Sequence, residues 1–129
     1  IVLEDDLMYI SVEEDKIAAL DALGQVVRLY DTGEYSMHHD FISDGEGNLL
    51  ILASRGGAQT GEDQIIALDL DSGEIIAQLD MGEMLSAYRA QTSADDTDWD
   101  WLHLNAIQEK DSDILVSSRE TSTIHISTI

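Results

Sequence analysis

The chain of 129 residues contains no cysteine, so disulfide bonds and thiolate chemistry are excluded. It has only six lysine and arginine residues against 27 aspartate and glutamate residues, which gives a formal net charge of −21. This shortage of positive charge argues against nucleic acid and anionic membrane surfaces as partners. No apolar run is long enough to span a bilayer, so no membrane insertion is expected. Any cationic pocket must therefore be built locally, within a solvated acidic surface.

The apolar segments that are present are short and rich in Ile, Leu and Val. Turn sequences such as residues 44–48 and 71–74 separate them at intervals of about 8 to 12 residues. This spacing predicts an all-β protein.

The sequence also repeats itself. Residues 38–55 and 103–119 share one pattern: His, any residue, Asp or Asn, any residue, Ile, a turn, an apolar run, Ser and Arg. Residues 16–31 match residues 64–80 in the same way. Repeats of this length indicate a solenoid or a propeller. Because the first pattern keeps its His, its Asp or Asn and its Arg while the turn changes length, it repeats a site as well as a scaffold.

Laid over one another, the repeats give a unit of four antiparallel strands, which is one propeller blade. We expect the last three strands of a blade in residues 1–34, a complete blade in 35–82, an inserted loop in 83–100 and the first three strands of the next blade in 101–129. A propeller closes with about four to eight blades. We therefore expect a β-propeller fragment of about two and a half blades, part of a longer protein, which forms homo-oligomers through its exposed sheet edges.

The first strand of each blade lies nearest the propeller axis, so His38 and His103 are predicted to converge there. Asn105 faces the same way as His103 on a strand of period two. Arg119 ends the antiparallel second strand and returns to the level of His103. Guanidinium, carboxamide and imidazole groups together suit a tetrahedral oxyanion such as sulfate or phosphate.

Three neighbouring side chains are assigned to substrate binding: Trp99, Trp101 and His39. The tryptophans end the inserted loop, and they either pack into the blade or form an aromatic wall beside His103. On a regular strand His39 faces away from His38 and packs between blades; the alternative is that His39 is the axial residue. A metal ion is the main rival ligand, but adjacent histidines on a strand diverge and cannot reach one ion without a bend, so no metal is assigned.

Residues 37–41, 100–107 and 115–124 resemble the bacterial arylsulfate sulfotransferases, PAPS-independent enzymes of the six-bladed propeller type. The Trp-x-His-x-Asn and Ser-Ser-Arg-x-x-Ser-Thr-Ile stretches are together fairly specific. The match covers essentially all of the chain from about residue 35.

The resemblance implies ping-pong transfer of a sulfuryl group from an aryl sulfate to a phenol through a sulfated histidine, without a soluble cofactor. It places His38, His103, Asn105 and Arg119 around the sulfuryl group. The covalent histidine would lie in a later blade, so this chain alone is expected to be inactive. The resemblance also implies a periplasmic or other extracytoplasmic location. The alternative function is a non-catalytic propeller that binds a partner on its face.

Overall fold

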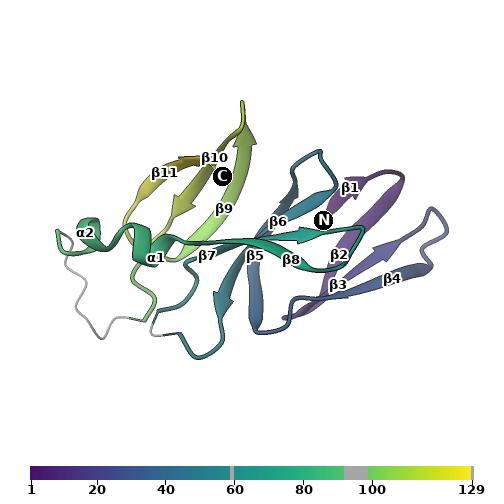
Figure 1. Cartoon of the computed structure of the whole chain (residues 1–129), viewed down its shortest axis with the longest axis horizontal. Coiled ribbons are helices and arrows are strands. Elements are labelled where there is room, and N and C mark those ends of the chain that lie inside the picture. Colours follow the sequence, from purple (N-terminus) through teal and green to yellow (C-terminus); the bar gives the residue numbers. More distant parts are fainter. Residues whose placement is uncertain (59, 92–98, 129) are drawn as a thin grey trace.

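A computed structural model describes residues 1–58, 60–91 and 99–128, with the side chains of residues 126–128 left out. Within these residues the protein has eleven strands in three antiparallel sheets, together with two helices of one turn each. The sheets follow one another along the chain and pack face to face without closing into a ring (Figure 1). The predicted all-β class and propeller arrangement are confirmed.

The first sheet has the strand order β1 (Val2–Glu4), β2 (Leu7–Glu13), β3 (Lys16–Leu20) and β4 (Val26–Asp31). It therefore contains four strands, whereas the sequence analysis expected three. The additional strand, β1, forms because the two aspartates that follow it adopt positive φ angles of 47° and 64°. Two such residues make the tight turn of a β-hairpin, which usually carries a glycine as its sequence signal.

The second sheet is also a meander, in the order β5 (Tyr35–Ser43), β6 (Asn48–Arg55), β7 (Gln64–Asp69) and β8 (Ile75–Asp80). The helices α1 (Met81–Met84) and α2 (Ser86–Arg89) follow β8. The helix α1 begins just before the predicted inserted loop of residues 83–100, and α2 lies within it. Residues 92–98 of that loop lie outside the described part of the chain.

The third sheet contains β9 (Leu104–Lys110), β10 (Asp113–Ser118) and β11 (Thr123–Thr128), with β10 in the middle. The first strands of the three sheets are neighbours, because β5 contacts both β1 and β9. This arrangement is the one expected around a propeller axis, and it brings β5 and β9 together although many residues separate them in the chain. No helix of the described residues is both long and apolar enough to cross a membrane.

The core consists of two layers on opposite faces of the second sheet. Alternate residues of β6 enter different layers: Leu49 and Ile51 face the first sheet, while Leu50 and Leu52 face the third. A strand covered on both faces needs an unbroken apolar run, and β6 has one. Each large side chain buried in this way contributes about 1.5–3 kcal/mol, so the central sheet is a firm support for the strands on either side.

Candidate active site

Both strands that carry the repeated histidines depart from regular β geometry at those residues. The pairing of β5 with β6 shifts across residues 38–40, and His39 has a φ of +55°. The pairing of β9 with β10 shifts at Asn105, and His103, just before β9, has a φ of +50°. Positive φ costs a residue other than glycine about 1–3 kcal/mol and tends to occur at functional sites. Bulges of this kind change the direction in which a side chain points.

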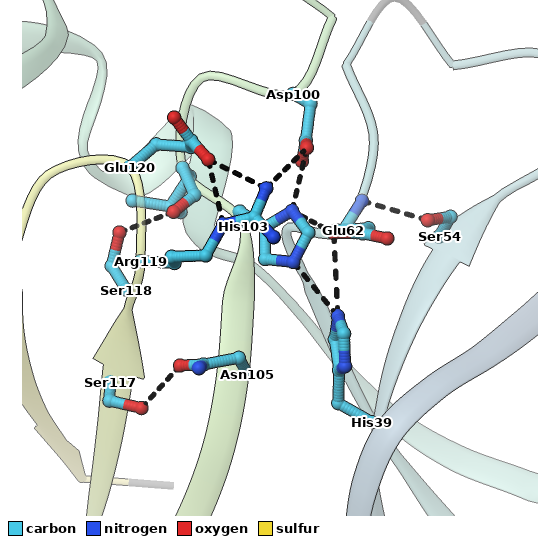
Figure 2. A network of polar contacts seen from close by, with 11 residues as sticks. His39, Ser54, Glu62, Asp100, His103, Asn105, Ser117, Ser118, Arg119 and Glu120 are labelled. Atoms are coloured by element: carbon cyan, nitrogen blue, oxygen red, sulfur yellow. Dashed lines mark hydrogen bonds and ion pairs between the residues drawn. The ribbon is translucent and has the colours of Figure 1, made fainter.

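The bulges place His39 of the second sheet against His103 of the third. Their Nε2 atoms are 2.9 Å apart and their ring centroids 4.8 Å apart (Figure 2). The backbone supports this approach, because the Asp40 carboxylate accepts a 3.2 Å hydrogen bond from the Ile107 amide of β9. Asp40, the repeat partner of Asn105, therefore joins the two sheets.

Two carboxylates contact the other nitrogen of His103. Asp100 Oδ2 lies 2.6 Å from His103 Nδ1, and Glu62 Oε2 is also in contact with this nitrogen. A neutral His103 therefore carries its proton on Nδ1 and accepts at Nε2, where His39 is the donor. Burial, followed by the negative charge of Asp100, raises the pKa of Glu62. The sequence analysis assigned no role to either carboxylate.

Glu62 is held in place by its backbone. Its amide donates to Ser54 Oγ at 2.8 Å, and its carbonyl accepts from the Leu104 amide at 2.9 Å. In the other copy of the repeat, the Ser118 hydroxyl donates to the Leu102 carbonyl. The repeated serine thus anchors a chain segment beside the histidines in both copies. This structural role explains why the repeat contains a serine at this position.

Arg119 lies at the solvent side of the cluster, and its side chain is 56% exposed. Its Nη2 atom is 3.7 Å from Asp100 Oδ2 and 2.7 Å from Glu120 Oε1. Its amide donates to the His103 carbonyl at 3.0 Å, so the backbone brings it back to the level of His103. Figure 2 shows Asn105 below these groups, where its carboxamide oxygen accepts from Ser117 Oγ at 2.6 Å and its amide nitrogen is a further donor.

His38, which the sequence analysis placed at the axis, lies beside His39. Their rings meet edge to face with centroids 5.1 Å apart. Burial lowers the pKa of His38 from 6.5 to about 4, against a smaller opposing contribution from the backbone of Ala53. His39, the alternative axial residue, is the one in contact with His103. The reason is the bulge, which interrupts the alternation of side chains on which the choice of His38 rested.

The two tryptophans lie in different environments, one buried and one exposed. Trp101 is only 2% exposed and belongs to the core layer between the second and third sheets, with the Arg89 guanidinium 5.3 Å from its ring centre. This placement favours a packing role for Trp101. Trp99 is 51% exposed and, with His38 and Glu62, lines a surface cavity of about 410 Å³. The lining of this cavity includes Glu62, which contacts His103, but not His103 itself, so an aromatic wall beside His103 stays a prediction.

Comparison with known proteins decides the family. Residues 1–127 match the family model described as Arylsulfotransferase (ASST). The chain belongs to this arylsulfotransferase family. The resemblance seen in the sequence motifs is thereby confirmed, and the match extends to the first sheet, which those motifs did not include.

No curated protein matches the chain. Among solved structures, the chain is similar to the glutaminyl cyclase of Myxococcus xanthus, with a TM-score of 0.61 and 10% sequence identity. The similarity covers 98% of this chain and 54% of that one, so the chain spans about half the length of this structure. At such low identity the likeness concerns the fold alone.

Proposed function

We propose that the protein transfers a sulfuryl group from an aryl sulfate to a phenol by a ping-pong reaction through a sulfated histidine outside this chain. The observation that carries the proposal is the contact between His39 and His103, on neighbouring sheets, beside the Arg119 guanidinium. Membership of the arylsulfotransferase family supports the same reaction class.

In a ping-pong reaction the sulfuryl group is transferred twice, first from the ester to the histidine and then from the histidine to the acceptor. In the first step the ester S–O bond breaks, the covalent histidine nitrogen bonds to sulfur, and the leaving phenolate takes up a proton. In the second step the oxygen of the acceptor phenol attacks sulfur, the S–N bond breaks, and the phenol proton is lost. Imidazole is suited to both proton transfers near neutral pH, and the contact with Asp100 orients His103 for them.

Negative charge develops on the peripheral oxygens of the sulfuryl group, by analogy with phosphoryl transfer. Fixed hydrogen-bond donors aimed at such oxygens provide much of the rate enhancement. We assign the guanidinium of Arg119 and the amide nitrogen of Asn105 to this role, with His39 and His103 as the proton donors and acceptors. Trp99 would contact the aromatic ring of the substrate from the wall of the adjoining cavity.

The assay uses the full-length protein with p-nitrophenyl sulfate as donor and a phenol as acceptor. We expect His103→Ala to reduce kcat/KM by about 100-fold or more, which is the usual contribution of a general acid or base. His125→Ala is the matched control, because His125 lies on β11 and packs against Tyr88. Unchanged turnover in His103→Ala would refute the assignment. Absence of turnover in the full-length protein would favour the non-catalytic binding module.

We further propose that the chain is part of a longer propeller. Large apolar side chains are exposed on the outer sheets, such as Leu3 on the first and Ile124 on the third, and additional blades would cover them.

For the isolated chain, we propose that copies associate by pairing through their open sheet edges. Light scattering should show concentration-dependent association, and a compact monomer at all concentrations would contradict it. A periplasmic location is proposed from the family and is tested by cell fractionation.

A further inference from the structure

A second group of side chains adjoins the proposed sulfuryl site. The donor atoms of His38, His39 and Glu62 all lie within 4.8 Å of one another. Within this group His39 Nε2 is 3.8 Å from Glu62 Oε2, which is close to the separation of two ligands on a tetrahedral metal ion. Two imidazoles and one carboxylate form a donor set found in catalytic zinc sites, where the fourth position stays open.

The bulge in β5 removes the objection to a metal that the sequence raised. On a regular strand the side chains of His38 and His39 would point to opposite faces. The left-handed backbone of His39 and the shifted pairing instead put both rings on one side, edge to face, with centroids 5.1 Å apart. The bend that two adjacent histidines need to share an ion is therefore present.

His38 also lacks the hydrogen bonds that a buried imidazole requires. Both of its ring nitrogens are shielded from solvent, and among the described residues neither makes a hydrogen bond of good geometry. The backbone of Ala53 is near enough to raise the pKa of His38 slightly, but it does not satisfy the ring. An unsatisfied buried polar group costs about 1–3 kcal/mol. The proposed sulfuryl transfer gives His38 no role, and a ligand bound at its ring would supply the missing interaction.

The charges around the cluster point to a cation as this ligand. Three carboxylates, those of Glu62, Asp100 and Glu120, contact His103 or Arg119, and the guanidinium of Arg119 is the fixed positive charge among them. Such surroundings oppose the binding of a sulfate ester. A divalent ion bound by Glu62 would offset two negative charges directly beside the position of the anion.

We propose that His38, His39 and Glu62 bind one divalent transition-metal ion of the zinc type, with its open coordination position towards His103 and Arg119. In the metal-bound state His39 Nε2 would bind the ion instead of contacting His103, and His103 alone would remain for proton transfer; the His39–His103 contact belongs to the metal-free protein. Imidazole donors favour zinc, nickel and copper over magnesium and calcium, so the site differs from an acidic surface that collects calcium. The site itself does not depend on the sulfotransferase reaction, because it rests on the donor atoms and on the buried His38 ring; only the charge argument draws on the proposed sulfate ester.

The test is metal binding by the full-length protein after treatment with a chelator. Titration calorimetry with ZnCl₂ alone should show one equivalent per chain, undiminished by millimolar magnesium or calcium. Each of His38→Gln, His39→Gln and Glu62→Gln should lower the zinc affinity by at least about tenfold. His125→Gln is the matched control and should bind as the wild type does. Circular dichroism checks that each variant is folded.

Two results would overturn the site. One is the absence of stoichiometric zinc binding in the wild type, and the other is zinc affinity that none of the three substitutions changes. Cobalt provides a second readout, since the visible d–d bands of a Co²⁺ complex with nitrogen ligands should disappear in a folded His38→Gln variant. Zinc binding is measured without substrate. A protein that does not bind zinc would therefore refute the metal site only, and the sulfotransferase assay would still decide the proposed reaction.

Discussion

Replacing His38 by leucine should change how the stability of the protein depends on pH. Burial lowers the pKa of His38 to about 4 in the folded protein, against 6.5 for an ordinary histidine. Between these two pH values the unfolded chain therefore binds a proton at this residue that the folded protein does not. Folded-state stability must fall as the pH decreases from about 6.5 to about 4, and the contribution is constant outside that window.

The size of the effect follows from the two pKa values. At about 1.4 kcal/mol for each pH unit between them, the full difference is about 3–4 kcal/mol. Because the His38 ring is not completely shielded from water, screening lowers the expected value to about 2 kcal/mol. His38→Leu has no proton to bind and should lack this part of the pH dependence.

Urea unfolding at pH 4 and pH 7, in buffer with a metal chelator, measures the effect. The many carboxylates also titrate in this range, but they do so in both proteins, so the difference between wild type and His38→Leu isolates the histidine. The variant should gain about 2 kcal/mol relative to the wild type on going from pH 7 to pH 4. Parallel stability curves for the two proteins would refute the view that His38 is buried and neutral.

Three further predictions concern the scaffold. Leu52→Ala should lower the free energy of unfolding by about 2–5 kcal/mol, since Leu52 is fully buried, whereas Ile76→Ala, at a 55% exposed position, should change it by under about 1 kcal/mol. Tyr30→Phe should cost about 1 kcal/mol in urea unfolding through loss of its buried 2.7 Å hydrogen bond to a backbone carbonyl. Gly61→Ala should shift tryptophan fluorescence, because a Cβ atom at this position would clash with the Trp99 ring; an unchanged spectrum would contradict this contact.

Much of the fold could be read from local patterns because each strand carries its own signal. The unbroken apolar run of β6 reflects burial on both faces. The turn signals at 44–48 and 71–74 lie where β5 leads into β6 and where β7 leads into β8. The strand β1 was missed, since three residues before a turn without glycine carry too little periodicity. The helices after β8 are single turns and have only a weak sequence pattern.

The sequence predicted several residues of the candidate site, but only part of how they are arranged. The repeated pattern identified His103, Asn105 and Arg119, and the structure brings the first and last of these together around Asp100. Glu62 could not be found in this way, because it lies outside the repeat and reaches the site through backbone bonds to Ser54 and Leu104. No spacing within the sequence indicates a contact of that kind.

The amino-acid sequence by itself determined the β class, the repeated blades, the sulfotransferase family and the residue types available for chemistry. These properties depend on alternation, turns and motifs, all of which are local in the chain. Tertiary structure alone decided which histidine faces His103, because a bulge in β5 reverses the direction of side chains without leaving a mark in the apolar pattern. It also decided that Glu62 and Asp100 join the histidines, since only the packing of neighbouring sheets brings these segments together.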